Sequence, residues 1–384
     1  MKLNKKGFGV AEIAIVILLI GILAAAVIAG FMGIKKNATE HVKEEATKSL
    51  EIIHQTKHAY PTILSRDQAG LEIKSDEYEV YELGGYSITG KPLNGSSLNS
   101  GVKNEGTLFI TGNGTLDKSI AINSNLPSYD TGYTAIDNYG DLTLSDLVVI
   151  GGGKYVKNKN QCYAIGCYGA DGKITMNNVY YNTTNGGFYV ADGATLILKG
   201  TNTYVTNLGS ERTGAYYFYS YGYIDAAEKV KEPDVWSSII IEDGTYHMAR
   251  WYTAFAYLVQ NAKITVKGGN FTAASGATPQ YGFLVYNDAK LEIEGGLFNF
   301  PVSKSLFVVS GSGQIVITGG DFVSKVTVGV SSGSPALKIC GGAFAWDPSA
   351  YVDDESGAYT ITKTSDYVCC DGKTRTMYVV TKNS

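Results

Sequence analysis

A short repeated phrase restricts the fold of this chain more than any other feature of its sequence. Each copy consists of an apolar residue, any residue, an apolar residue, a corner of small residues, and then an apolar or aromatic residue. The five clearest copies begin at positions 239, 264, 291, 315 and 337, so the steps between them are 25, 27, 24 and 22 residues. Repeats of this length are typical of solenoids, in which each unit packs mainly against its two neighbours.

The internal pattern of the phrase predicts its local structure. The clear copies are IIIEDGTY at 239–246, ITVKGGNF at 264–271, LEIEGGLF at 291–298, IVITGGDF at 315–322 and LKICGGAF at 337–344, and looser copies begin at Leu108, Leu142, Ile174 and Leu196. The alternation of apolar residues predicts a β-strand, and the Gly-Gly or Asp-Gly predicts a corner with unusual backbone angles or close packing. A second strand precedes each phrase, as in GFLVYNDAKLEI, with Asn, Asp or Gly at the turn. Each repeat is therefore predicted to hold about three short strands that stack in parallel on those of the next repeat.

This organisation resembles the right-handed parallel β-helix of the pectate-lyase-like superfamily. The resemblance implies a mainly β fold, with a β-helix (β-solenoid) over residues 106–345 and roughly nine or ten coils. Leucine-rich repeats have a similar length, but they need a helix or an extended arc in each unit and an Asn ladder, which we do not find in the sequence. The 46 glycines and 8 prolines agree with a fold that contains many corners.

Both ends of a β-solenoid need a cover, because exposed strand edges pair with other chains. Residues 61–105 contain YEVYELGGYSITG and are predicted to form a linker, a first irregular coil and the N-terminal cap. Residues 346–384 are predicted to form the C-terminal cap, in which DPSAYVDDESGAYTIT and TMYVVTK make a closing hairpin.

Aromatic residues provide the candidate ligand-binding surface. We aligned the strands that precede the phrases by their turns. This alignment predicts that Phe188, Ala256, Phe283 and Phe307 point inward, whereas Tyr189, Tyr257, Leu284 and Val308 form an outward column on one sheet. Planar side chains on a flat sheet stack on sugar rings or bury against a neighbouring subunit at little cost in side-chain entropy. The candidate binding residues are Tyr189, Tyr257, Trp251 and Tyr252. Contact with another subunit and plain packing between coils are the alternatives.

The repeats show no recognisable catalytic constellation. Residues 106–384, which we call the head, contain a single histidine, His247, and the arginines Arg212, Arg250 and Arg375. Their aspartates are scattered, for example Asp137, Asp141 and Asp146. Hydrolytic glycosidases need two carboxyl groups at a fixed separation across a groove, whereas aspartates at corners usually cap turns. Neither the residue set of the polygalacturonases nor the basic pair of the lyases is apparent. We therefore expect no catalytic residues, no cofactor and no metal site.

The five cysteines are candidates for disulfide bonds, as expected for an exported protein. Cys162 and Cys167 flank one corner and are predicted to pair. Cys340 is predicted to pair with either Cys369 or Cys370, which are adjacent in the sequence. Metal binding is the alternative, but no histidine stands near any of the five.

The N-terminal segment has the composition of a membrane helix with one anomaly. A basic leader carries Lys2, Lys5 and Lys6, and the apolar stretch 13–34 has no charge. Glu12 lies directly before this stretch, five residues after a Gly-Phe junction. A charged side chain within a membrane-length helix costs about 2.5–3.5 kcal/mol, so a partner or a role is expected for it. An ordinary signal anchor would explain the apolar length but neither Glu12 nor the junction.

These residues resemble the type IV prepilin signature, and the resemblance covers about Lys5 to Tyr60. It implies a leader at 1–7, cleavage and methylation by a prepilin peptidase between Gly7 and Phe8, and a pilin-type helix at 8–60 whose part 8–34 lies in the membrane and then in the filament core. It also implies that Glu12 pairs with the amino terminus of Phe8 in a neighbouring subunit. A helix to Tyr60 agrees with Pro61, which disfavours helical backbone before it.

Together these features predict a structural, pilin-like filament subunit that displays a β-helix head for adhesion or for binding a surface polysaccharide. The expected partners are the prepilin peptidase, other pilin subunits, the cytoplasmic membrane, and a polysaccharide or host surface. The protein is expected first in the cytoplasmic membrane and then in an extracellular filament. A formal net charge of -4 argues against nucleic acid as a partner. The alternatives are an anchored polysaccharide lyase or hydrolase and a pseudopilin of a secretion system.

Overall fold

The head region accounts for nearly all of the described structure. The computed structural model describes residues 61–92, 99–112, 121–123, 133–151, 154–156, 161–183, 187–200, 203–207, 216–221, 234–248, 254–275, 279–302, 304–324, 328–333, 336–352 and 357–383. Residues 62–384 form one compact unit. The predicted leader and helix, with Gly7, Phe8 and Glu12, lie outside the described residues. Within the described ranges, no helix has the length and apolar character needed to cross a membrane.

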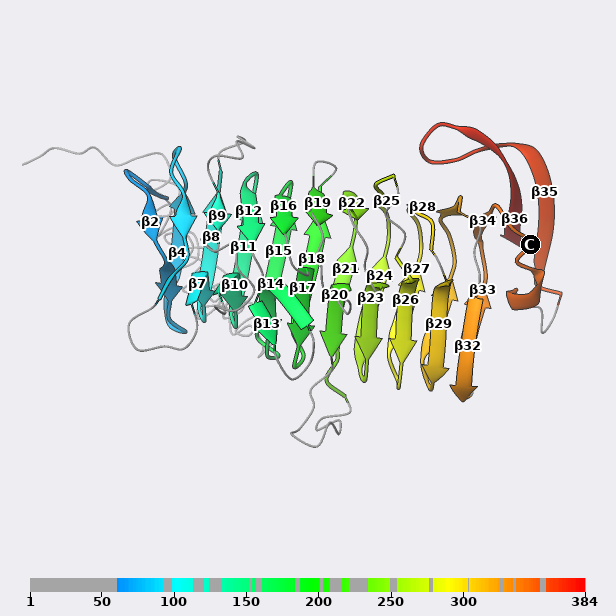
Figure 1. Cartoon of the computed structure of the whole chain (residues 1–384), viewed down its shortest axis with the longest axis horizontal. Helices are drawn as coiled ribbons and strands as arrows, with labels where there is room; N and C mark the ends of the chain where they lie inside the picture. Colours follow the sequence, from blue (N-terminus) through cyan, green and yellow to red (C-terminus); the bar gives the residue numbers. More distant parts are fainter. Residues whose placement is uncertain are drawn as a thin grey trace, which may run out of the picture. The chain divides into compact units, whose positions relative to one another are not determined.

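Three long sheets build this unit (Figure 1). Sheet A contains β1 (Thr62–Ile63), β4 (Tyr78–Glu82), β8 (Thr107–Thr111), β11 (Asp141–Ser145), β15 (Lys173–Asn177), β18 (Thr195–Lys199), β21 (Ser237–Ile241), β24 (Ala262–Val266), β27 (Lys290–Ile293), β30 (Gln314–Ile317) and β33 (Ala336–Ile339). Sheet B contains β2 (Gln68–Ala69), β5 (Ile88–Thr89), β9 (Ile122–Asn123), β12 (Val148–Gly151), β16 (Tyr180–Thr183), β19 (Tyr204–Asn207), β22 (Thr245–Met248), β25 (Asn270–Ala273), β28 (Leu297–Asn299), β31 (Asp321–Phe322), β34 (Gly342–Phe344), β36 (Thr374–Lys382) and β35 (Tyr359–Val368).

Sheet C contains β3 (Leu71–Ile73), β7 (Asn99–Asn104), β10 (Tyr133–Asn138), β14 (Gln161–Tyr168), β17 (Gly187–Ala191), β20 (Tyr216–Tyr221), β23 (Ala254–Val259), β26 (Tyr281–Tyr286), β29 (Ser305–Gly311) and β32 (Val328–Gly333). Two short strands, β6 (Lys91–Pro92) and β13 (Lys154–Val156), pair antiparallel with β7 and β14. One 3₁₀ turn, η1, spans Ser349–Tyr351.

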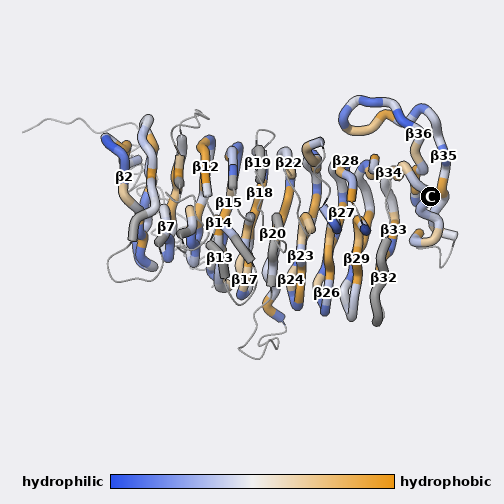
Figure 2. The backbone as a smooth tube through the Cα atoms, in the orientation of Figure 1, coloured by the Kyte–Doolittle hydropathy of each residue, from blue (hydrophilic) through white to orange (hydrophobic). Residues whose placement is uncertain are grey.

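The chain enters sheets A, B and C in turn, and each strand of the stack pairs in parallel with the strand one coil away. The fold is therefore mainly β with long parallel sheets, an arrangement compatible with a β-helix or solenoid. The ladders begin at Thr62, which pairs with Tyr81, and so extend further toward the N-terminus than the predicted start at residue 106. Figure 2 shows that hydrophobic segments recur in the strands of successive coils.

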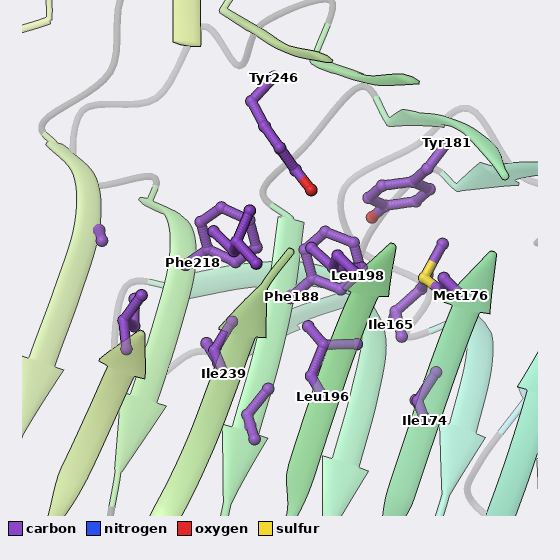
Figure 3. Packing of buried hydrophobic residues seen from close by; sticks show 14 of the residues in the cluster. Ile165, Ile174, Met176, Tyr181, Phe188, Leu196, Leu198, Phe218, Ile239 and Tyr246 are labelled. Atoms are coloured by element: carbon purple, nitrogen blue, oxygen red, sulfur yellow. The ribbon is translucent and has the colours of Figure 1, made fainter. Parts of the chain in front are cut away.

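The repeated phrase places its first residue in a single column of sheet A. The nine residues predicted to begin copies are in consecutive Cα register: Leu108, Leu142, Ile174, Leu196, Ile239, Ile264, Leu291, Ile315 and Leu337. Figure 3 shows three of them, Ile174, Leu196 and Ile239, on neighbouring strands inside the core. Alternation with a period of two thus buries one face of each strand.

The aromatic residue that ends each phrase forms a second column, on the inner face of sheet B. Rings of Tyr246, Phe271, Phe298, Phe322 and Phe344 stack in sequence, with centroids 4.9, 4.7, 4.6 and 4.8 Å apart. Their planes deviate from parallel by 16°, 3°, 4° and 3°. The separation matches the spacing between hydrogen-bonded strands, so the backbone ladder sets the stacking distance.

The Gly-Gly corners meet two different requirements. Gly296 has a φ of 100°, in the left-handed region that other residues adopt only with strain. A Cβ at its neighbour Gly295 would overlap the Lys267 carbonyl oxygen of the preceding coil. The first glycine therefore allows close approach of the coils, and the second allows the turn.

A C-terminal hairpin covers part of the end of the stack (Figure 1). Strand β36 pairs antiparallel with β34 and with β35, so it closes the free edge of sheet B. The buried Asp321, in β31, accepts hydrogen bonds from the Tyr367 hydroxyl at 2.8 Å and from the Cys370 backbone N–H at 2.6 Å. These bonds fix the hairpin against the outer face of sheet B, in the segment that the sequence assigns to the C-terminal cap.

The predicted disulfides do not form. Cys162 and Cys167 belong to the same continuous strand, β14, and five residues of extended chain separate Cα atoms by about 16 Å, beyond the reach of a disulfide. Cys167 is a buried free thiol. Cys340, Cys369 and Cys370 are also free. The hairpin carries the adjacent pair onto sheet B, where Cys369 packs with Ala343 and Met377, whereas Cys340 lies at the corner before β34.

Two buried asparagines form a short ladder at a corner between sheets C and A. Asn104 donates through Nδ2 to Asn138 Oδ1 at 2.8 Å, and Asn138 donates to the Gly140 carbonyl oxygen at 2.7 Å. Cys167 occupies the next position in register. This pair, which the sequence pattern did not indicate, satisfies backbone groups at the corner.

Candidate functional site

The outer face of sheet C carries the aromatic column predicted from the sequence. Tyr189, Tyr219, Tyr257, Leu284 and Val308 follow one another in Cα register. Their neighbours Phe188, Ala256, Phe283 and Phe307 lie in the main core and are at most 1% exposed, as predicted. Tyr189 and Tyr257 are partly exposed on the opposite face. Trp251 and Tyr252 lie outside the described residues.

The part of this face around β14 and β17 holds a cluster of four tyrosines. Tyr163 and Tyr189 stack with ring centroids 5.0 Å apart, and Tyr139 stacks on Tyr168 at 4.9 Å. Tyr168 joins the two pairs, since its ring lies 5.7 Å from that of Tyr189 and 6.4 Å from that of Tyr163. We call these four residues the tyrosine cluster. Tyr139 is the most accessible, with 37% of its surface exposed.

A buried carboxylate anchors the tyrosine cluster. Asp137 is 1% exposed, and its Oδ2 accepts hydrogen bonds from the hydroxyls of Ser100 and Thr134, both at 2.6 Å. Its Oδ1 accepts a bond of 3.3 Å from the Tyr168 hydroxyl. Gly166 makes this contact sterically possible, because a Cβ there would overlap the Tyr168 side chain. A buried charge needs such partners to offset its desolvation.

Burial raises the pKa of three phenols in the cluster. Desolvation raises the pKa of Tyr163 and of Tyr168 well above the usual value for tyrosine, and the negative charge of Asp137 raises both further. Desolvation also raises the pKa of Tyr139. The phenols of Tyr139, Tyr163 and Tyr168 therefore remain neutral at physiological pH, and these three are not poised to act as bases.

The part of this face formed by β23, β26 and β29 carries an apolar cluster. It consists of Ala254, Leu284 and Val308, with Tyr257, Tyr281 and Tyr286 packed against it. Leu284 is 5% exposed and Val308 8%, so this part of the predicted outward column is more buried than a bare sheet face would be. Tyr257 and Tyr286 meet edge to face at 5.5 Å, and the Lys304 ammonium lies 5.2 Å from the Tyr281 ring centroid.

The two clusters offer ring faces and phenol groups on one side of the coils. This combination suits a polymer with apolar ring faces and hydroxyl groups, because aromatic side chains supply contact area and hydroxyls supply directed hydrogen bonds. The sequence pattern placed Asp137 only among scattered aspartates and did not indicate Tyr139, Tyr163 or Tyr168 as binding residues. A signal was present in β10 and β14, where Asp137 pairs with Gly166. A tyrosine follows two residues after each of them, Tyr139 and Tyr168, so extending the alignment to these strands would have revealed the cluster.

Asp141, Asp146 and His247, which were also considered for catalysis, do not belong to either cluster, and Arg212 and Arg250 lie outside the described residues. Asp141 forms an ion pair with Lys173 at 3.1 Å, and Asp146, with a φ of 53°, accepts hydrogen bonds from Ser145 and Asn178 at a corner. His247 Nδ1 lies 2.9 Å from the Thr272 hydroxyl on sheet B, and burial lowers its pKa. Across the described ranges, no three His, Cys, Asp or Glu side chains group in a way that could hold a metal ion.

Searches among protein-family models, curated proteins and solved structures find no significant match to this chain.

Proposed function

We propose that this protein is a type IV pilin-like filament subunit, and that its head is a right-handed β-helix of the pectate-lyase-like type that binds a surface polysaccharide. The combination of residues around Glu12 supports the first part. The observation that carries the second part is the outer face of sheet C, where the tyrosine cluster and the apolar cluster extend across consecutive coils.

The order of strands supports the finer description of the head. Each coil contributes one strand to each of three parallel sheets, and rings and aliphatic side chains stack in columns inside them. Parallel strands joined by crossovers are right-handed in nearly all known cases, which favours this hand here.

The N-terminal residues support the proposed assembly. Cleavage after Gly7 would leave Phe8 as the new amino terminus, and Glu12 would pair with that amine in a neighbouring subunit. A buried pair sets register because leaving either charge unpaired is costly. The partners would be the prepilin peptidase and other pilin subunits, and the protein would pass from the cytoplasmic membrane to an extracellular filament.

Two measurements test the assembly. The N-terminal mass of the mature protein should correspond to a start at Phe8 with a methyl group, whereas an uncut Met1 would support a signal anchor instead. Glu12→Ala should abolish filaments while the head keeps its circular dichroism spectrum. Filaments formed normally by this variant would overturn the pilin proposal.

Polysaccharide binding is tested with the purified full chain against a panel of insoluble and soluble polysaccharides. Tyr189→Ala and Tyr257→Ala should each weaken binding about tenfold, equivalent to about 1.4 kcal/mol. Tyr86→Ala provides the matched control, because Tyr86 is 38% exposed and belongs to neither cluster. Equal loss in the control, or no binding at all, would reject the proposed role of sheet C. Release of products during incubation would instead indicate an enzyme.

A further inference from the structure

A groove separates the tip of the C-terminal hairpin from the corners that join sheets A and B. Cys370 and Asp371 form the wall on the hairpin side, and the opposite wall and floor come from three consecutive coils. Its volume is about 320 Å³, within the range of small-molecule sites. The groove lies on the sheet B side of the coils and shares no residue with the tyrosine cluster or the apolar cluster.

The groove exists because the hairpin covers only part of the outer column of sheet B. That column runs through Thr245, Asn270, Leu297, Asp321 and Ala343 in Cα register. The hairpin covers Ala343 and bonds to Asp321, and its tip reaches the level of Leu297. Thr245, Asn270 and Leu297 therefore line the groove that continues beyond the tip.

The polar groups in the groove are mainly hydrogen-bond acceptors. Asn270 Oδ1 is buried and has no hydrogen-bond partner in the structure. Asp243 uses Oδ1 to accept from the Gly244 N–H at 2.7 Å, which leaves its other oxygen for a second donor. Thr245 adds a hydroxyl, which can donate or accept. A buried acceptor without a partner favours a ligand that brings a donor.

The charge in the groove is low. Arg375 binds Asp371 through two hydrogen bonds of 2.6 and 2.7 Å, so the carboxylate on the hairpin wall is already neutralised. Asp243 is the other charged residue among the lining residues. Glycine backbone and the Leu297 side chain supply surfaces without charge. Such a lining suits a neutral ligand with many hydroxyl donors better than an anion.

We propose that this groove is a second binding site, which takes one or two neutral sugar rings. Sugar hydroxyls would donate to Asn270 and Asp243, and an apolar ring edge would rest against Leu297. The hairpin tip acts as a fixed wall, because Asp321 holds the backbone of Cys370. This site is independent of the sheet C surface and would bind an end or a branch of a glycan rather than the side of a polymer.

Cys370 supplies a local probe of occupancy, because its exposed thiol lines the groove. The rate of Cys370 alkylation by iodoacetamide at pH 8.5 would be measured on the full chain by peptide mass spectrometry, with and without cellobiose, maltose or chitobiose. At least one disaccharide should slow Cys370 alkylation about fivefold or more while leaving Cys340, which does not line the groove, unchanged. Equal rates with all three would overturn the proposal.

Variants show whether the protection of Cys370 from alkylation depends on the polar groups of the groove. Asn270→Leu, which keeps the branched side-chain shape but removes the acceptor, should abolish the protection, and Thr245→Val should reduce it. Asn299→Leu is the matched control, since Asn299 is exposed on the same sheet outside the groove and its variant should keep full protection. Protection that persists in both groove variants would reject the site. Protection by calcium chloride alone, without sugar, would reject a sugar site in favour of a cation site.

The sheet C variant Tyr257→Ala distinguishes this proposal from the proposed function. It should weaken polysaccharide binding but leave the protection of Cys370 unchanged. Loss of both in this variant would show that the two sites are not independent and would overturn the second site.

Discussion

The rings of Phe298 and Phe322 lie 4.6 Å apart and 4° from parallel, in neighbouring coils. Each ring ends one copy of the repeated phrase, and each occupies the same position on the inner face of sheet B. The backbone spacing of a parallel sheet therefore turns a repeat of about 25 residues into a continuous aromatic column.

Truncating the centre of this column should be costly. Phe298→Ala removes a ring that is 2% exposed and stacks on both Phe271 and Phe322, so the free energy of unfolding should fall by about 3–5 kcal/mol. Phe109→Ala, at a ring that is 37% exposed on sheet A, should change it by only about 1 kcal/mol or less. Denaturant unfolding followed by circular dichroism measures both. Similar losses would contradict the importance of the column.

The corner glycines should differ in the cost of adding a methyl group. Gly295→Ala forces a Cβ against the Lys267 carbonyl oxygen of the preceding coil, so the coils must separate and the loss should exceed about 2 kcal/mol. Gly372→Ala, at the hairpin tip, meets no atom within 4 Å but has a φ of 75°, so it should lose only about 1–2 kcal/mol from backbone strain. Thermal unfolding of the two variants tests the order, and a smaller effect at Gly295 would refute the close-approach argument.

Asp321 should control how firmly the hairpin is held. Asp321→Ala leaves the Tyr367 hydroxyl and the Cys370 N–H without their acceptor, at a cost of about 1–3 kcal/mol. Hydrogen exchange should accelerate in residues 359–382 and stay unchanged in 290–293. Asp366→Ala, at an exposed position of β35, is the control and should leave both segments as they are. Uniform acceleration would mean that the hairpin and the coils unfold together.

The hairpin tip should also respond to acid. Hydrogen bonds from Arg375 lower the pKa of Asp371 to about 2, from an ordinary value of 3.8. Because the folded pKa lies below the unfolded one, this stabilisation is complete above about pH 5 and disappears as the pH falls through 2. The difference in unfolding free energy between the parent protein and Arg375→Gln should therefore shrink between pH 5 and pH 2.

Urea denaturation at pH 6, 4, 3 and 2 measures that difference. Lys382→Gln, which removes an exposed basic side chain of β36, serves as the comparison and should give a difference that changes little with pH. A difference for Arg375→Gln that stays constant down to pH 2 would show that the Asp371 pair contributes nothing to stability.

Local patterns were sufficient to predict most of the core. The alternation of apolar residues and the Gly-Gly corners are short-range signals, and they placed all nine first residues of the repeats in one column. The same alternation separated the buried Phe188 and Phe283 from the outward Tyr189 and Tyr257. Such assignments succeed because a strand has a period of two whatever lies around it.

The predicted pairing of Cys162 with Cys167 was wrong because the backbone between them is a strand and not a corner. The predicted link between Cys162 and Cys167 assumed a corner between them, but β14 continues through both residues. Nothing in the local sequence distinguishes a corner from an extended strand there, because pairing with strands of two other coils keeps β14 extended, with one register shift between Tyr163 and Ile165.

The sequence by itself determined the repeat and the inward and outward faces of the strands, and the assembly proposal rests on the N-terminal residues around Glu12. Tertiary structure alone decided that Asp137 would meet Tyr168, 31 residues away, and that Asp321 would hold Cys370, 49 residues away. The first group depends on backbone periodicity within a few residues. The second depends on which coil lies beside which and on how far the hairpin folds back, and these are set only when the coils stack.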